Sequence, residues 1–428
     1  MIKNNKNLLI THMTMTFLLF MFFMSGSSFA QNNQKKDHCM VLIADRVFDG
    51  FNLLEDAAVL LKGNKIIQTG DQMTLRDNCK RTLDLGDATI LPGFIESHAH
   101  LAIQNIPQDK VLKHGITTVR DTGGPLQEPR GGQGTLRVLN AGPIIQAIDG
   151  YPLNIFGHGT GTHDPYDAVG IAVATAEEAE KVVKDLVAGG STIIKIALEP
   201  GGESGAPWMS SHGHGEPPQT PWPILPLEIV KAIVNKAHSL NKRVMAHVGE
   251  NIGVELALEG GVDEWAHIPC AEIREDLLHR AVAQNVTFVT TVDTLSACAG
   301  VHSNVHKLAH IMAHNSDSKS EFIYGSEIGH DNVPWGINGE EMRLLLHLTS
   351  GESIEFTDVL NVFKSVTSTA GKNLNKPLLG TLSPNAPADI IAVRGNAFER
   401  FKLLEYPDLV ISGGHIVVNE FKHDKKHR

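Results

Sequence analysis

The middle of the chain alternates short apolar runs with longer segments whose apolar residues recur every three or four positions. Residues 191–198 (STIIKIAL) and 242–248 (KRVMAHV) are short runs rich in β-branched residues. Between them, the apolar residues of 226–241 fall on one helical face, which predicts an amphipathic helix. Strands that alternate with helices at this pitch indicate a parallel sheet covered by helices.

The same alternation extends in both directions. A helix is predicted over 175–190, where Thr175 and Glu178 have capping-box spacing and glycines follow the last apolar turn. Downstream, the pattern predicts a helix at 253–261, a strand at 262–268, a helix at 271–285 and a strand at 286–292. Over residues 91–380 this alternation of strands and helices favours an α/β fold, a (β/α)8 barrel of the TIM type.

Two β-rich segments flank the predicted barrel. Residues 31–90 contain short apolar runs separated by turn signals, and similar runs return in 381–421. We expect these two segments to form one small β-sandwich. The basic residues 422–428 (KHDKKHR) are expected to be a flexible tail.

Residues 1–30 have the features of a secretory signal. Lysines precede the apolar run FLLFMFFM (17–24), and SFA (28–30) offers a cleavage site near Ala30. We therefore expect a periplasmic or secreted protein with no membrane segment after cleavage. The net charge is −11 over 428 residues, which disfavours nucleic acid as a partner. A small-molecule substrate is expected, and the chain leaves open whether it forms a homo-oligomer.

Four cysteines are present, and none forms a CxxC pair, so a cysteine zinc site is not expected. Export permits disulfides. Cys39 and Cys79 flank one β segment and are predicted to be bonded. Cys270 and Cys298 are predicted to be buried thiols.

The stretch TILPGFIESHAHLA (89–102) ends an apolar strand with two histidines, His98 and His100. Residues two apart on a strand face the same side, so the two imidazoles point the same way. Imidazole is the commonest metal ligand among side chains, and catalytic zinc sites favour nitrogen ligands. The pair therefore indicates a metal site.

Other chemically active side chains stand at the ends of later strands. His247 lies in VMAHVGE, His267 in EWAHIP, Lys195 in TIIKIAL and Glu327 in FIYGSE. Each alone would be an ordinary core or surface residue, but barrel active sites gather at the C-terminal ends of strands. A lysine inside an apolar strand is costly unless it is paired or neutralised. Carbamylation by carbon dioxide would turn Lys195 into an anionic ligand able to bridge two cations.

These motifs together resemble the amidohydrolase superfamily over essentially the whole mature chain. LPGFIESHAHL matches the histidine pair after the first barrel strand, and KHGITTVRDTGG (113–124) resembles the second strand. Lys195 matches the carbamylated lysine, and His247 and His267 match the ligands of the next two strands. GTLSPNAPADIIAV (380–393) resembles the return into the sandwich. The chain is most similar to the imidazolonepropionase-like branch, which includes Xaa-Pro dipeptidases.

The resemblance also implies catalytic residues. His158, in FGHGTG, matches a histidine that polarises the substrate carbonyl in relatives. Relatives carry Asp in a GTD or GSD motif after the eighth strand, whereas this chain has GSE, so Glu327 is the expected proton carrier and Asp331 the alternative. His212 and His214, in the long loop 199–223, lie outside the family pattern and are expected to be solvated.

The function expected from this resemblance is hydrolysis of an amide or peptide C–N bond of a small substrate, with a dipeptide or N-acyl amino acid favoured. Two divalent metal ions are expected, bridged by carbamylated Lys195. His98 and His100 would hold the first ion, and His247 and His267 the second. Zinc is the first expectation, although the ligand types also admit manganese or iron. The alternatives are a lactonase, a deaminase, or a metal-binding homologue that has lost catalysis.

Overall fold

The computed structural model describes residues 39–157, 165–211, 218–330 and 332–421. All of its helices and strands belong to one compact unit, His38–Arg428. The predicted signal segment, 1–30, and the predicted tail, 422–428, lie outside the described residues. Across the described part of the chain, no helix combines the length and apolarity needed to cross a bilayer.

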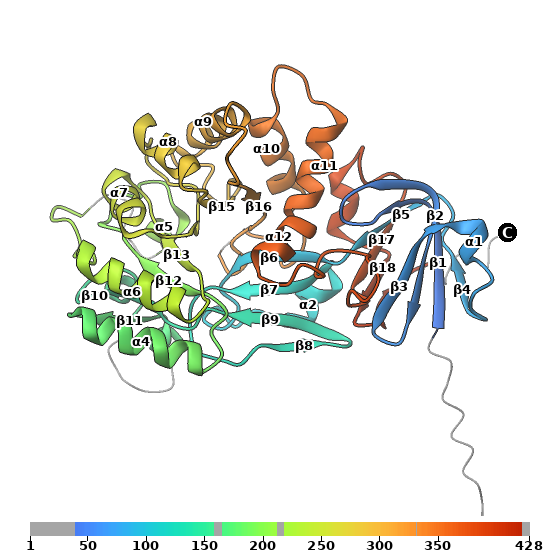
Figure 1. Cartoon of the computed structure of the whole chain (residues 1–428), viewed down its shortest axis with the longest axis horizontal. Helices are drawn as coiled ribbons and strands as arrows, with labels where there is room; N and C mark the ends of the chain where they lie inside the picture. The colour runs from blue at the N-terminus through green and yellow to red at the C-terminus, as the bar shows by residue number, and fades with distance from the viewer. Residues whose placement is uncertain (1–38, 158–164, 212–217, 331, 422–428) are drawn as a thin grey trace, which may run out of the picture. The chain divides into compact units, whose positions relative to one another are not determined.

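A barrel of parallel strands occupies the centre of the chain (Figure 1). Its strands, in spatial order, are β6 (Phe94–Ala99), β7 (Ile116–Asp121), β9 (Thr135–Asn140) continued by β10 (Ile144–Ala147), β12 (Ile194–Ala197), β13 (Val244–His247), β14 (Glu264–Trp265), β15 (Thr287–Val289) and β16 (Phe322–Ile323). The predicted (β/α)8 barrel is therefore confirmed.

Hydrogen bonding between the first and last barrel strands closes the ring. The Ser97 amide donates to the carbonyl of Tyr324 at 3.2 Å, and the Glu327 amide donates to that of His98 at 3.1 Å. On the other side, β9 pairs with β7, and β10 pairs with β12, so these two short strands act as one broken third strand. Two further strands lie outside the ring: β8 (Arg130–Gly132) pairs with β9, and β11 (Gly170–Val173) pairs with β10.

Helices surround the barrel, and each one packs against its neighbour in the chain (Figure 1). The main helices are α4 (Ala176–Ala188), α6 (Leu227–Ser239), α7 (Asn251–Gly260), α8 (Glu275–Ala283), α9 (Val301–Ala313), α10 (Gly339–Thr349), α11 (Phe356–Ser365) and α12 (Ser368–Asn373). Shorter elements are α1 (Gln72–Leu75), α2 (Gln108–Lys113), α3 (Leu153–Phe156), α5 (Pro207–Ser211), and the 3-10 turns η1 (Pro165–Ala168) and η2 (Phe401–Glu405).

Helix α4 shows how local sequence sets a boundary. The Thr175 hydroxyl accepts a hydrogen bond from the Glu178 amide at 3.2 Å, as the predicted cap requires. The Glu178 carboxylate, however, accepts from the Ala174 amide rather than from Thr175, so the reciprocal half of the predicted capping box is displaced by one residue. The helix ends before Gly189, and its buried face consists of Ala179, Val183 and Leu186.

The two β-rich segments predicted at the ends of the chain share one eight-stranded sheet. Its strands are β1 (Cys39–Phe48), β2 (Leu53–Lys62), β3 (Lys65–Asp71), β4 (Thr82–Asp84), β5 (Ala88–Pro92), β17 (Ile390–Arg394), β18 (Leu409–Ser412) and β19 (His415–Asn419). The N-terminal strand β5 pairs antiparallel with the C-terminal strand β17, which places blue and red ribbons side by side in Figure 1. One sheet thus joins segments from opposite ends of the described chain.

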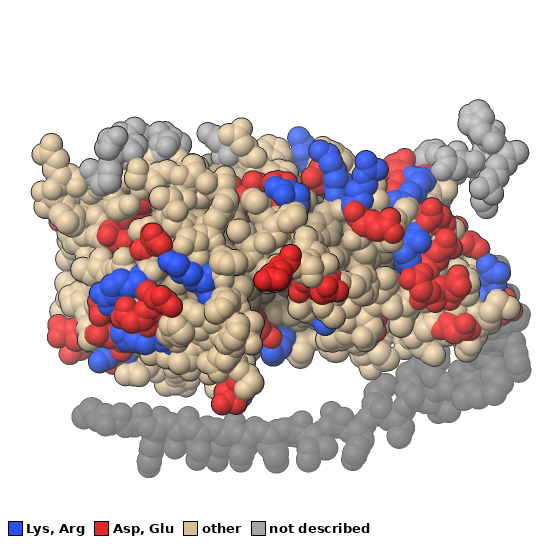
Figure 2. Space-filling view, turned by 90° about the horizontal axis from the view of Figure 1, so that it is seen from above, with Lys and Arg blue, Asp and Glu red and all other residues tan. Residues whose placement is uncertain are grey.

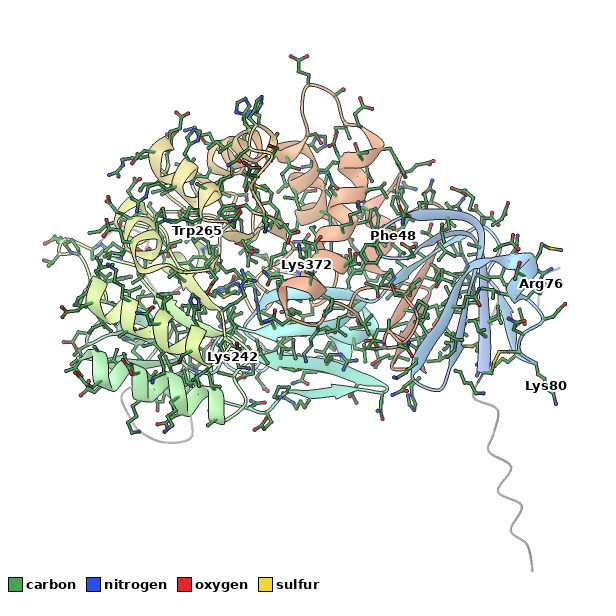
Figure 3. The ribbon with its side chains drawn as sticks, in the orientation of Figure 1. Phe48, Arg76, Lys80, Lys242, Trp265 and Lys372 are labelled. Carbon is green, nitrogen blue, oxygen red and sulfur yellow. A yellow bond between two sulfur atoms is a disulfide. The ribbon has the colours of Figure 1, made fainter. Side chains whose placement is uncertain are left out.

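Aromatic packing ties this sheet to the barrel helices. Phe48, at the end of β1, is fully buried, and its ring centroid lies 5.7 Å from that of Phe363 in α11 (Figure 3). Phe398 also lies 5.7 Å from Phe48, and its ring stacks on that of Phe363 at 4.0 Å. Aromatic pairs at this spacing contribute about 0.5–1.5 kcal/mol beyond their buried area. On the face shown in Figure 2, lysines and arginines are interspersed with acidic residues rather than gathered into one patch.

Both cysteine pairs are disulfides. The Cys39–Cys79 bond was predicted and is confirmed. The prediction that Cys270 and Cys298 are free thiols is wrong, because these two residues are bonded to each other. The two cysteines belong to consecutive loops, after β14 and after β15, and neighbouring parallel strands bring such loops side by side. Their Cα atoms are 4.9 Å apart.

Candidate metal centre

The predicted ligands meet at the C-terminal end of the barrel. His98 lies in β6, Lys195 in β12 and His247 at the end of β13, while His267 and Glu327 follow β14 and β16. All of these side chains are buried, as is His100, which immediately follows β6. Five strands therefore bring these six side chains together, as the sequence pattern predicts.

The Glu327 carboxylate contacts three of the histidines in this cluster. Its Oε1 lies 3.0 Å from His100 Nε2, and its Oε2 lies 3.3 Å from both His98 Nε2 and His267 Nδ1. Two ligands held about 2.1 Å from one tetrahedral ion lie roughly 3.4 Å apart, so these spacings match those of atoms that share a cation. Glu327 Oε2 is also buried without a hydrogen-bond partner. The donor set fits a divalent cation.

Lys195 points into the same cluster. Its Nζ lies 3.0 Å from His98 Nε2, and the residue is only 1% exposed. Burial lowers the pKa of this amine to about 8, although the nearby Glu327 carboxylate partly opposes the shift. A lowered pKa increases the fraction of neutral amine near physiological pH, and carbon dioxide reacts with the neutral amine. Lys195 is therefore chemically suited to carbamylation.

The histidines are held in the neutral state that metal binding requires. Burial lowers the pKa of His100 and of His247 to about 4, and it holds the pKa of His98 and His267 well below their usual range. His98 Nδ1 lies 2.8 Å from the carbonyl oxygen of Ala266, which fixes the proton on that nitrogen and leaves Nε2 free for a cation.

A buried acid braces the backbone that carries Glu327. Glu96 in β6 accepts hydrogen bonds from the amide and the hydroxyl of Ser326, and also from the His98 amide. Burial raises the pKa of Glu96 to about 8. Glu327 itself has φ of 66°, a left-handed conformation that is uncommon for a residue with a side chain. These contacts hold the carboxylate of Glu327 in a strained backbone position between the first and last strands.

The ionisation of Glu327 suits a proton acceptor. Burial by itself would raise the pKa of this carboxyl. The imidazoles of His98, His267 and His100 outweigh burial and hold the pKa of Glu327 well below its usual range. Glu327 is therefore a carboxylate at neutral pH.

A small cavity of about 20 Å³ adjoins the cluster. Its wall includes the metal-ligand candidates His100, His247 and His267, together with the aromatic residues Tyr151 and Trp208. A volume of this size accommodates about one water molecule. The arrangement therefore places space for a water beside the Glu327 carboxylate and next to apolar walls.

Some of the predicted functional residues cannot be placed. His158, predicted to polarise the carbonyl, lies outside the described residues. So do Asp331, the alternative proton carrier, and the loop histidines His212 and His214. Their predicted roles stay predictions.

The structure also reveals polar residues that the sequence analysis missed. His330 lies 3.4 Å from Glu327 Oε1 and lines the cavity. Glu203 lies 2.9 Å from His247 Nε2, and Glu199 lies close by. His330 follows Glu327 by three residues, and Glu199 and Glu203 lie at the start of the long loop 199–223. In the sequence, only their closeness to the motifs that contain Glu327 and Lys195 could have indicated that they belong to the site.

The Cys270–Cys298 bond supports the loop that carries His267, which leads to a prediction. Cys270→Ser with Cys298→Ser opens a loop of 28 residues, and we expect the free energy of unfolding to fall by about 3–4 kcal/mol. We also expect weaker metal binding, because His267 lies just before Cys270. Melting temperature and metal affinity are the measurements.

The matched control is Cys39→Ser with Cys79→Ser, which opens a comparable loop of 40 residues in the other sheet. This variant should lose similar stability but keep its metal affinity. Equal loss of metal affinity in both double variants would contradict a specific role for the Cys270–Cys298 bond.

The sequence profile of the amidohydrolase family matches residues 89–417. An imidazolonepropionase from Bdellovibrio bacteriovorus is 40% identical over 58 residues, a match that covers 12% of this chain and only 14% of that protein.

Solved structures are similar over nearly the whole chain. A prolidase in complex with N-methylphosphonate-L-proline has 19% identity and a TM-score of 0.67, covering 89% of this chain and 100% of that one. A Xaa-Pro dipeptidase with bound methionine has 20% identity and a TM-score of 0.68, covering 88% and 99%. The ochratoxinase of A. niger has 17% identity and a TM-score of 0.68, covering 89% and 96%.

These structural likenesses establish the fold, and the profile match covers well over half of the 428 residues, from β5 of the terminal sheet through the barrel to β19. The chain belongs to the amidohydrolase family.

Proposed function

We propose that this protein is a metal-dependent hydrolase that cleaves the amide-type C–N bond of a small substrate, with dipeptides and N-acyl amino acids as the first candidates. The observation that carries the proposal is the convergence of four buried histidines and Lys195 around the Glu327 carboxylate. Family membership supports a hydrolase of C–N bonds. The prolidase and the Xaa-Pro dipeptidase among the similar structures support the substrate class.

Two divalent cations, zinc in the first instance, are part of the proposal. Such cations would supply Lewis acidity towards a carbonyl oxygen and would lower the pKa of a bound water from 15.7 towards about 7. His98 and His100 would hold one ion, and His247 and His267 the other, with carbamylated Lys195 between them. The spacing of 3.0 Å between Lys195 Nζ and His98 Nε2 supports this assignment.

Glu327 would act as the proton carrier. Its carboxylate is ionised at neutral pH, lines the small cavity and lies within 3.4 Å of several imidazole nitrogens. It would accept a proton from the attacking water and would return that proton to the departing amine. A carboxylate in this position can serve as base and then as acid within one turnover.

Tyr151 is a further hydrogen-bond donor on the cavity wall. Its ring lies 4.8 Å from that of His247, and burial holds the pKa of its hydroxyl well above the usual range. The phenol therefore keeps its proton and can donate to a substrate oxygen. Trp208 and Ile144 make the neighbouring wall apolar, which favours an uncharged group next to the scissile bond.

The experiment that tests the function uses the purified protein and a library of dipeptides and N-acyl amino acids. We expect turnover of at least one member, loss of that turnover on treatment with EDTA, and its return when zinc is added back. Elemental analysis of the same sample should give about two metals per chain. A protein that binds metal but hydrolyses no amide, ester or amidine substrate would instead support the binding-only alternative.

A further inference from the structure

Two buried glutamates lie next to His247, on the loop that follows β12. Glu199 and Glu203 are each 1% exposed. Among the described residues, no lysine or arginine forms an ion pair with either of them. Buried acids of this kind are uncommon unless another group engages them. The proposed reaction gives them no role.

The contacts of Glu203 identify the group that it engages. Its Oε2 accepts a hydrogen bond from the indole nitrogen of Trp208 at 2.6 Å. The same oxygen lies 2.9 Å from Nε2 of His247. An indole can only donate, so Trp208 anchors the carboxylate while leaving it free to bind the imidazole. Trp208 also lines the cavity, so the anchor is part of the active-site wall.

This contact determines which nitrogen of His247 is available to a cation. Whether the shared proton resides on the ring or on the carboxyl, Nε2 is engaged with Glu203. The described residues give Nδ1 no hydrogen-bond partner, and His247 lines the cavity. Ligating histidines commonly bind a carboxylate through the nitrogen that does not face the metal, and this contact fixes both tautomer and ring orientation.

The backbone opposite Glu203 is shaped to admit it. A Cβ atom at Gly249 would lie 2.3 Å from Cγ of Glu203 and 2.3 Å from Oε2 of Glu199. Only glycine leaves room there for both side chains. Glu199 in turn accepts hydrogen bonds from the amides of Gly201 and Gly202, which shapes the turn that presents Glu203. The loop is therefore built around the carboxylate pair.

We infer that Glu203 is a positioning residue that orients His247 for the second metal ion, so that Nδ1 of His247 is the ligand atom. The inference rests on the proposed metal-dependent function, but it concerns binding of the ion rather than turnover. Glu203 is not among the residues that line the cavity. It acts through His247 alone.

The test measures metal binding to the full chain with zinc, using a competing chelator. Glu203→Leu keeps the approximate volume of the side chain but removes the acceptor. We expect the zinc at His247 and His267 to lose about 10- to 100-fold in affinity, while the zinc at His98 and His100 is retained. Glu203→Gln keeps an oxygen in place for both donors, and we expect it to restore most of the affinity.

Glu250→Gln is the matched control. Glu250 is a half-buried neighbour of the same loop that approaches Gly202 but makes no contact with His247. This variant removes a carboxylate, as Glu203→Leu does. Because Glu250 does not contact His247, the second zinc should bind as in the wild type. A second variant, Gly249→Ala, displaces the Glu203 carboxylate without removing it and should weaken the same ion. It keeps the inference testable if Glu203→Leu does not fold.

The outcomes separate this inference from the proposed function. Wild-type affinity for both ions in folded Glu203→Leu or in Gly249→Ala would overturn the positioning role. Three zinc ions in the wild type and two in Glu203→Leu would also overturn it, because the carboxylates would then hold an ion of their own. Two zinc ions in a wild type that hydrolyses nothing would refute the proposed reaction while leaving the positioning role intact.

Discussion

Lys195→Ala should reduce bound metal from about two ions per chain to one or fewer and should remove most activity. The side chain is buried, its amine lies 3.0 Å from His98 Nε2, and burial lowers its pKa to about 8. Without the lysine, the carbamate proposed to bridge the two histidine pairs is lost. We expect turnover to fall by more than about 100-fold. That value is the upper end for loss of a group that only supports a metal ligand, and Lys195 is itself a proposed ligand.

The dependence of metal uptake on bicarbonate is an independent test of the carbamylation of Lys195. Metal-free protein reloaded in bicarbonate-free buffer should take up less metal than protein reloaded with bicarbonate, and this difference should vanish in Lys195→Ala. The exposed Lys184→Ala serves as the control and should behave as the wild type. If Lys195→Ala keeps two metals and normal turnover, the carbamate bridge is wrong.

Glu327→Gln should retain much of its metal but lose roughly 10²- to 10⁴-fold in turnover, because the amide cannot accept the proton of the attacking water. The histidine and lysine ligands remain in place in this variant. Metal content and kcat, measured on the same preparation, separate the two effects. A fully active Glu327→Gln would show that another group carries the proton, and His330, 3.4 Å from Glu327 Oε1, would be the first described candidate.

Glu327→Asp tests whether the site is built for the longer side chain. Aspartate would set the carboxylate back by roughly 1–1.5 Å. The glutamate reaches His98, His100 and His267 at 3.0–3.3 Å from a backbone position fixed by φ of 66° and by Glu96. We expect the shorter acid to lose about 100-fold in rate, the usual effect of a 1 Å misplacement. Activity equal to the wild type would show that the barrel end tolerates either length.

Periodicity explains why the barrel could be predicted from sequence. The helix predicted over 226–241 is observed as Leu227–Ser239, and the strand predicted over 191–198 is observed as Ile194–Ala197. The observed strands are shorter than their apolar runs, and for β14 and β15 the residues outside the strand include several at the C-terminal end of the run. His267 illustrates this, since it follows β14 rather than lying within it.

The ligand cluster was predictable because its members stand at strand ends, where a parallel barrel brings distant residues together. Glu203 and His330 lie on loops, where no period links sequence position to space. The Cys270–Cys298 bond was missed for a related reason. Its two residues are neighbours only because consecutive strands are adjacent, and neither local sequence contains a pairing signal.

The sheet formed by both ends of the chain has a consequence for the order of folding. β5 can pair with β17 only after almost the whole chain has been made, since these strands are separated by the entire barrel. Contacts over such separations form slowly, because loop closure must precede them. Until then the apolar face of the N-terminal strands lacks its partner, and the chain stays open.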